Sequence, residues 1–246
     1  MRRFAALFAA LDATTKSSAK VAALAAYFRD APEADRVWTV ALLSHRRPRR
    51  AVTATELRLW AAEAAGIPDW LFEECYAVAG DLAETIAHLL PPPGAASDQS
   101  LADRIAALRA LAGAPAEARR AAILAAWDAL TPPERFVFNK LITGGFRMGV
   151  SQGLMTQALA QATGLPAADL AHRLMGDWDP ARIGWDALIG GATDAARPYP
   201  FALATQLDGG PEALGPPGDW LAEWKWDGIR AQAIRRAGAL HLWSRG

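Results

Sequence analysis

The stretch NKLITGGFRMGVSQGLMTQALA, residues Asn139–Ala160, shows most clearly how this chain folds. Apolar residues recur at helical spacing on both sides of a glycine-rich centre, so the stretch predicts two amphipathic helices joined by a loop. Glycines let a backbone approach a partner closely, and a helix that begins near Ser151 would point amide hydrogens outward, which suits a phosphate. An ordinary corner between two helices is the alternative. The loop residues that we single out are Gly144, Gly145, Arg147 and Gly149.

Helical spacing of apolar residues extends from the start of the chain to about residue 195. It is clear in VAALAAYFRD (residues 21–30) and LADRIAALRALAG (residues 101–113), where alanine and leucine are abundant and Gly or Pro marks the joints. We therefore predict a mainly α protein with an all-helical N-terminal domain over residues 1–195. Tryptophans at helical spacing are predicted to lie in its core, namely Trp38, Trp60, Trp70 and Trp127.

The sequence changes character near residue 190, where Gly, Pro and Asp become frequent, and we place a domain boundary at about residue 195. Alternation in EWKWD, Glu223–Asp227, predicts a strand with the charged residues on one face and two tryptophans packed beneath them on the other. The stretch IRAQAIRRAGALHLWSR, residues 229–245, predicts two strands joined by a turn near Gly238. Residues 196–246 are therefore expected to form the first antiparallel strands of a second domain.

Formal charges cancel over the whole chain, but they are segregated along it. Residues 1–60 carry eleven Lys and Arg against five Asp and Glu, whereas residues 61–130 carry four against ten. Such asymmetry suggests that one face meets an anionic partner.

The densest basic segment is SHRRPRR, Ser44–Arg50, in which Pro48 prevents either neighbouring helix from continuing. With a duplex as partner, each arginine could neutralise one phosphate and release counterions, which gives affinity without base readout. A solvated surface patch is the alternative. The candidate cations are Arg46, Arg47, Arg49 and Arg50, with Lys16 and Lys20 of TTKSSAK as weaker candidates.

Composition excludes several classes of protein. No run approaches the eighteen apolar residues of a membrane span, and the start lacks the pattern of an export signal, so we expect a cytoplasmic protein. The single cysteine, Cys75, rules out an internal disulfide framework and is expected to be a packed core thiol. The histidines lack metal-ligand spacing.

The stretch EWKWDGIR, Glu223–Arg230, carries the strongest chemical signal. Apolar surroundings and a nearby cation both disfavour an ammonium ion, so Lys225 between two tryptophans would lose affinity for its proton, and a neutral amine is a nucleophile. A solvated lysine beside a hairpin turn is the alternative.

KWDGIR resembles the Lys-x-Asp-Gly-x-Arg signature of the covalent nucleotidyltransferases, which include DNA ligases, RNA ligases and capping enzymes. EWKWDGIRAQ, residues 223–232, is most similar to the ATP-dependent DNA ligases, and LWSRG, residues 242–246, resembles the next motif of that family at the expected distance. The resemblance implies that Lys225 attacks ATP and holds AMP, which passes to the 5′ phosphate of a nick in duplex DNA. It also implies Mg²⁺, with ligands that the sequence does not identify. The nucleotide contacts that it implies are Glu223, Arg230 and Arg245.

The helical part shares this resemblance. TGGFRMGVS (residues 143–151) and VAGDLAET (residues 78–85) resemble two blocks of the DNA-binding domain that precedes the adenylation domain in many DNA ligases. The family's later motifs and its OB-fold domain do not follow, so we expect a truncated, monomeric ligase acting in repair, recombination or replication, with its adenylation domain of α+β type incomplete. A non-catalytic DNA-binding module and an RNA ligase or capping enzyme are the alternatives.

Overall fold

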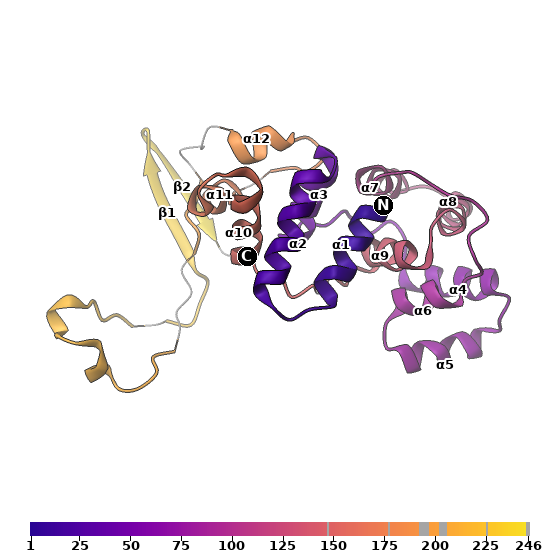
Figure 1. The fold of residues 1–246 in the computed structure, drawn as a ribbon, viewed down its shortest axis with the longest axis horizontal. Coiled ribbons are helices and arrows are strands. Elements are labelled where there is room, and N and C mark those ends of the chain that lie inside the picture. Colours follow the sequence, from indigo (N-terminus) through magenta and orange to yellow (C-terminus); the bar gives the residue numbers. More distant parts are fainter. Residues whose placement is uncertain (147, 177, 192–196, 202–205, 225, 245–246) are drawn as a thin grey trace.

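The computed structural model of the chain describes residues 1–146, 148–176, 178–191, 197–201, 206–224 and 226–244. These residues form a mainly α protein, as predicted, in which helices dominate and one β-hairpin follows them (Figure 1). The helices are α1 (Arg2–Asp12), α2 (Ser17–Asp30), α3 (Glu33–Leu43), α4 (Ala54–Ala65), α5 (Asp69–Ala79), α6 (Leu82–Leu89), α7 (Leu101–Ala110), α8 (Ala116–Asp128), α9 (Pro132–Thr143), α10 (Gln152–Thr163), α11 (Ala167–Arg173) and α12 (Trp185–Gly190).

Local capping explains where several of these helices begin. Thr53, Ser100 and Thr131 each precede a helix whose third residue is acidic, and each pair forms a reciprocal capping box. In a capping box the hydroxyl accepts from a free amide of the first turn while the acid accepts from the capping residue. The boundaries of α4, α7 and α9 are therefore encoded within a few residues of sequence.

The helices pack as two groups that share α9 and one continuous hydrophobic core (Figure 1). Helix α2 packs against α1 and α10, α11 continues from α10, and α3 contacts α12. At the other end α6 packs against α9, and α4 contacts α5, α6 and α8. The shared helix α9 also contacts α1 and α7, so it connects both groups.

Two buried charges tie segments that are distant in sequence. The carboxylate of Asp35 accepts from the amide nitrogens of Leu101 (3.2 Å) and Ala102 (2.9 Å), so it caps α7 from α3. The guanidinium of Arg135 donates to the carbonyl oxygens of Trp127 (2.6 Å) and Pro91 (2.6 Å). Because buried polar groups are costly without partners, these bonds specify how the helices meet.

The predicted core tryptophans are confirmed at Trp38, Trp60 and Trp127, which are buried. Trp127 also donates from its Nε1 to the Oδ1 of Asn139 at 2.8 Å. The prediction for Trp70 is wrong, because its side chain is 67% exposed. Helix α5 buries only Phe72, so the apolar spacing that includes Trp70 does not face the core. Cys75, expected in the core, is only half-buried on the same helix.

The hairpin predicted around Gly238 is confirmed. Strands β1 (Ala231–Arg236) and β2 (Ala239–Ser244) pair in antiparallel register, with Ala231 opposite Ser244 and Arg236 opposite Ala239. Ala237 and Gly238 form the turn with positive φ angles of 49° and 80°. Positive φ at both central residues is the geometry of the tight turns that join twisted strands.

The strand predicted for EWKWD is wrong for the residues that the structure describes. Residues 223, 224, 226 and 227 are irregular, and Trp224 and Trp226 are 85% and 83% exposed instead of packed. A strand requires a hydrogen-bonded neighbour, and the described residues form only the two-stranded sheet β1–β2. The domain boundary predicted at about residue 195 falls outside the described residues. Within the described part of the chain, no helix is long and apolar enough to cross a bilayer.

Candidate nucleic-acid interface

The glycine loop, which we define as residues 144–151, lies between α9 and α10 as predicted. Gly144 ends α9 in the left-handed region, with φ 82°, and its amide donates to the carbonyl oxygen of Lys140. Ser151 is the N-cap of α10, and its hydroxyl accepts from the amide nitrogen of Leu154 at 3.2 Å. The helix start predicted near Ser151 is therefore confirmed. Arg147, predicted at the centre of the loop, lies outside the described residues.

Each glycine of the loop lies against a cationic side chain. A Cβ atom at Gly144 would lie 2.8 Å from the Nη1 of Arg47, and one at Gly149 would lie 2.7 Å from the Nζ of Lys20. At Gly145 the nearest atom would be the Nζ of Lys140, at 3.2 Å. The absence of a side chain at these positions therefore lets three cations approach the loop backbone.

Lys20 reaches the loop from α2. Its Nζ donates to the carbonyl oxygens of Met148 (2.7 Å) and Gly149 (3.2 Å), and the side chain is only 8% exposed. This ammonium group is directed at the backbone of the loop, so it anchors the loop. Its predicted contact with DNA stays a prediction, as does that of Lys16, which is exposed at the start of α2.

The basic segment Ser44–Arg50 divides into two parts. Arg46 is half-buried: its Nη2 donates to the carbonyl oxygen of Gly176, and its guanidinium lies 4.7 Å from the ring centroid of Trp178. Its neighbour Arg47 is exposed and lies against Gly144, on the glycine loop. The two adjacent arginines therefore have different environments, one between helices and one at the surface.

The other two arginines of the segment are exposed. Arg50 donates from its Nη2 to the carbonyl oxygen of Thr143 at 3.2 Å, so it also lies beside the end of α9. Arg49 is exposed between Arg47 and Arg50. The structure thus brings Arg47 and Arg50 to the glycine loop, while Arg46 faces the body of the protein.

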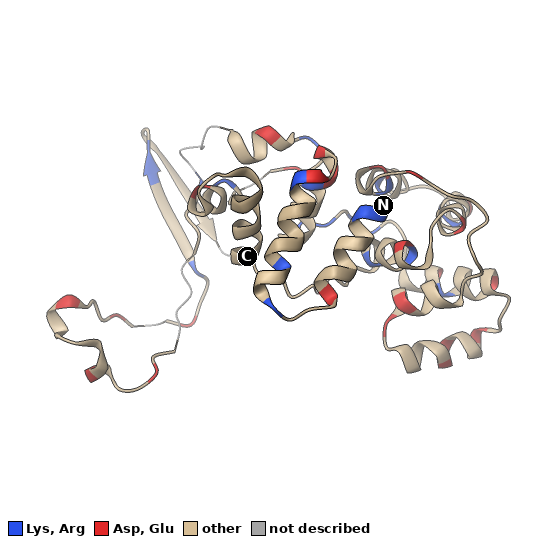
Figure 2. Cartoon of the chain, in the orientation of Figure 1, with Lys and Arg blue, Asp and Glu red and all other residues tan. Residues whose placement is uncertain are grey.

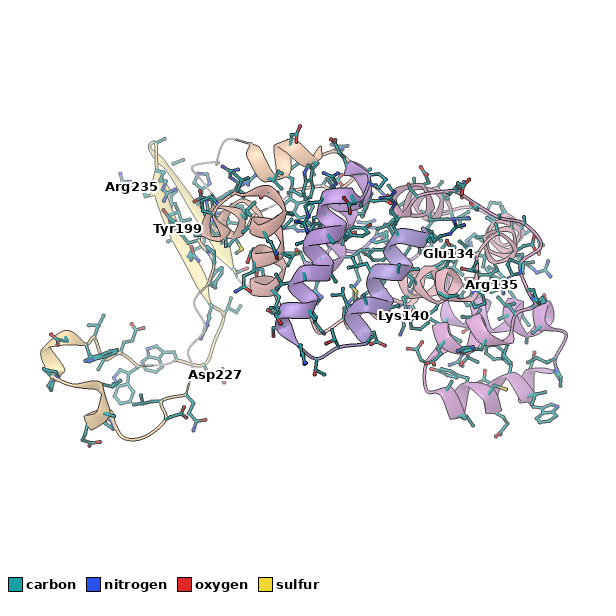
Figure 3. The ribbon with its side chains drawn as sticks, viewed as in Figure 1. Glu134, Arg135, Lys140, Tyr199, Asp227 and Arg235 are labelled. Atoms are coloured by element: carbon teal, nitrogen blue, oxygen red, sulfur yellow. The ribbon has the colours of Figure 1, made fainter. Side chains whose placement is uncertain are left out.

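Lys140 is a residue of this surface that the sequence analysis did not single out. It lies in the last turn of α9 (Figure 3), is largely buried, and forms an ion pair with Asp81, the residue that caps α6. Burial would raise the pKa of Asp81, but hydrogen bonds from Lys140 and from the amides of Glu84 and Ala83 hold it below its usual value. The pair therefore joins Asp81 of VAGDLAET to the last turn of α9, directly before TGGFRMGVS. The sequence feature that could have indicated Lys140 is its position four residues before Gly144, the glycine that ends α9.

Acidic residues gather on a different part of the molecule. Asp69, Glu73 and Glu74 lie on α5, at the outer edge of the second helical group (Figure 2). Helix α5 therefore carries a row of carboxylates, one of which, Glu73, lies 3.5 Å from the Nη1 of Arg58 on α4.

Two of the residues predicted to bind the nucleotide, Glu223 and Arg230, lie in the described part of the chain. Lys225 and Arg245 lie outside it. Glu223 is exposed, and Arg230 is half-buried just before β1. Asp227, a motif residue without a predicted nucleotide contact, lies in the irregular segment away from the helices (Figure 3). The described residues also contain no group of three or more His, Cys, Asp or Glu side chains that could hold a metal ion.

The fold and the loop surface define an all-helical domain that presents glycine backbone among cations. Residues 1–160 match the family model described as DNA ligase N terminus, and the chain belongs to this family.

Curated relatives support this membership. The chain is 34% identical over 156 residues to a probable DNA ligase of Anaeromyxobacter sp. (strain Fw109-5), which covers 60% of this chain and 29% of the relative. It is 36% identical over 171 residues to a probable DNA ligase of Anaeromyxobacter sp. (strain K), and this match covers 63% of this chain and 33% of the relative. A probable DNA ligase of Mycolicibacterium gilvum (strain PYR-GCK) is 31% identical over 175 residues, and this match covers 65% of this chain and 34% of the relative. The chain spans about a third of the length of these relatives.

Proposed function

We propose that this chain is the N-terminal part of an ATP-dependent DNA ligase and that its helical domain holds duplex DNA at a nick. The observation that carries the proposal is the set of cations gathered on the glycine loop, in a domain of the DNA ligase N-terminal family. Glycine backbone and arginines suit phosphates because both present donors that do not depend on base identity. A nick-sealing enzyme needs such binding, since nicks occur in any sequence.

Affinity of this kind depends strongly on salt. Each phosphate that a cation neutralises releases condensed counterions. Each such contact makes the slope of log K against log salt concentration more negative by about 0.9. The exposed arginines Arg47, Arg49 and Arg50 are the proposed phosphate contacts, together with Arg147 and Lys16. Lys20 and Arg46 are proposed to act through the loop and the fold, since their cations are bound to carbonyl groups.

The chemical part of the proposal rests on the motif at Lys225. Its ε-amine would attack the α-phosphorus of ATP with loss of pyrophosphate, and AMP would then pass to the 5′ phosphate of the nick. Glu223, Arg230 and Arg245 would contact the nucleotide. Mg²⁺ is part of the proposal without assigned ligands, since the described residues form no metal-binding cluster. Phosphoryl transfer of this type depends mainly on positioning and on neutralisation of the phosphate oxygens.

The DNA-binding part is tested by fluorescence anisotropy with a labelled nicked duplex over a series of salt concentrations. The triple variant Arg47→Gln, Arg49→Gln, Arg50→Gln is compared with Arg2→Gln, Arg29→Gln, Arg182→Gln, which removes the same charge from exposed arginines elsewhere. We expect the first variant to bind more weakly, with a slope smaller by about two to three, and the second to bind as the wild type does. Equal affinity of both triple variants would remove these arginines from the interface.

The chemical part is tested by offering ATP labelled at the α-phosphate to the full-length protein. We expect an acid-labile adduct that Lys225→Ala abolishes, and an adduct that survives this change would contradict the assignment. DNA binding without any adduct would instead favour a non-catalytic DNA-binding module. A comparison of nicked DNA with nicked RNA separates a DNA ligase from an RNA ligase or capping enzyme.

A further inference from the structure

A cavity of about 260 Å³ opens beside the glycine loop, where α4, α5, α6 and α9 meet. Its polar lining includes Arg50, Arg58, Tyr76, Asp81, Lys140 and the backbone of Gly145. The buried side chains of Val52, Leu57 and Leu82 form its apolar wall. A charged group in such a site is screened less than on an open surface, so the cations of the lining act strongly on a bound anion.

The three cations are held by different elements. The guanidinium of Arg58 on α4 lies 4.7 Å from the ring centroid of Tyr76 on α5, and its Nη1 is 3.5 Å from the Oε1 of Glu73. Arg50 is positioned by its bond to the carbonyl oxygen of Thr143, and Lys140 by its ion pair with Asp81. The cations are therefore placed before any ligand arrives, which lowers the entropy cost of binding.

The net charge of the lining is positive. Asp81 is the one acidic residue among the residues that line this cavity, and its carboxylate already accepts from Lys140 and from the amides of Ala83 and Glu84. Glu73 meets Arg58 at 3.5 Å, beyond the usual length of a charge-assisted hydrogen bond. Both arginines therefore keep donors for an anion, and a guanidinium fork matches the oxygens of a phosphate.

The cavity is also continuous with the proposed DNA surface. It shares Arg50 and Gly145 with the surroundings of the glycine loop, and Gly80 and Asp81 with the segment VAGDLAET. We propose that this cavity binds one backbone phosphate of the DNA duplex, with Arg58 and Arg50 as its main contacts and Lys140 paired to Asp81 as a positioning cation. This inference rests on the proposed DNA-binding function. The cavity shares Arg50 with the proposed phosphate contacts Arg47, Arg49 and Arg50, and it adds Arg58 as a new contact.

The test is an Arg58→Gln variant, measured by anisotropy with the nicked duplex across salt concentrations. We expect about tenfold weaker binding at low salt and a logarithmic salt slope smaller by about one. Arg120→Gln is the matched control. Arg120 lies on α8 and forms an ion pair with Glu63 of α4, the helix that carries Arg58, but Arg120 does not line the cavity. The control should bind as the wild type does.

Stability is measured in parallel, since Arg58→Gln also removes the contact with Tyr76. Arg58→Lys keeps the charge without the fork, and we expect its affinity to lie between those of wild type and Arg58→Gln. Binding by Arg58→Gln that equals binding by Arg120→Gln overturns the proposal. A wild-type protein that binds no DNA contradicts the proposed function itself, so the two failures are distinguishable.

A second arm uses inorganic phosphate to separate a duplex phosphate from a small free anion. If phosphate in the millimolar range raises the melting temperature of the wild type but not of Arg58→Gln, while both bind DNA equally, the cavity is a free-anion site and the inference is wrong. If both the phosphate effect and the DNA slope fall in Arg58→Gln, the inference holds.

Discussion

The Nζ of Lys20 lies 2.7 Å from the carbonyl oxygen of Met148, which is 128 residues further along the chain. This bond joins α2 to the glycine loop, and a second bond to the carbonyl oxygen of Gly149 reinforces it. Because the lysine is buried, its hydrogen bonds compete little with water. The position of the loop therefore depends on a residue of α2, which is neither of the two helices that the loop connects.

Removing this anchor should affect both the fold and DNA binding. In Lys20→Met the aliphatic stem remains but two carbonyl groups lose their donor, so we expect the free energy of unfolding to fall by about 1–3 kcal/mol. DNA affinity should fall as well, since the loop backbone loses its support. Lys16→Met, four residues earlier and exposed, should change stability by less than about 0.5 kcal/mol. Urea unfolding and anisotropy measure the two effects, and equal stability of the two variants would contradict the anchor.

The glycines of the loop allow a similar comparison. Gly144 and Gly164 both end helices in the left-handed region, with φ of 82° and 74°, so alanine strains the backbone similarly at both positions. A Cβ meets Arg47 at Gly144 but nothing within 4 Å at Gly164. We expect both alanine variants to lose about 1 kcal/mol of stability, and only Gly144→Ala to weaken DNA binding through displaced Arg47. Equal DNA affinity of the two variants would show that the position of Arg47 is unimportant.

Features that depend on neighbouring residues were predictable from the sequence. The start of α10 at Ser151 and the turn at Gly238 follow from capping and turn preferences that act within a few residues. The burial of Trp38, Trp60 and Trp127 follows from helical spacing. Trp70 has the same spacing but lies on a helix with few core neighbours, so periodicity alone does not distinguish it.

Features that depend on distant contacts were not predictable in the same way. No local pattern indicates that Lys20 reaches Met148, or that Lys140 pairs with Asp81. The alternation in EWKWD predicts a strand, yet residues 223, 224, 226 and 227 have no pairing neighbour among the described strands. The candidate site is thus predictable in its residue types, whereas the partners of each residue require the fold.

The ion pair between Asp81 and Lys140 predicts a dependence of stability on pH. Because the pKa of Asp81 is held below its usual value in the folded protein, its contribution is complete above the ordinary aspartate pKa and is lost as pH falls through the folded value. Asp81→Asn keeps a residue that caps helices well but removes the charge. We expect the difference in unfolding free energy between wild type and Asp81→Asn to be largest near neutral pH and to shrink below about pH 4. Denaturant unfolding between pH 7 and pH 3 measures it, and a constant difference would contradict the role of the charge.

Arg46 and Arg47 are adjacent in sequence, but we expect substitution of Arg46 to lower stability and substitution of Arg47 to lower DNA affinity. Arg46→Ala removes the contact with Trp178 and the donor to the carbonyl of Gly176, so we expect the free energy of unfolding to fall by about 1–2 kcal/mol. Arg47→Ala removes an exposed cation beside Gly144, so stability should change by less than about 0.5 kcal/mol while DNA affinity falls and the salt slope decreases by about one. Thermal unfolding and anisotropy on both variants check the division. If Arg47→Ala destabilised the protein as much as Arg46→Ala, the separation of this basic segment into a structural and a DNA-facing part would be wrong, because both arginines would then support the fold.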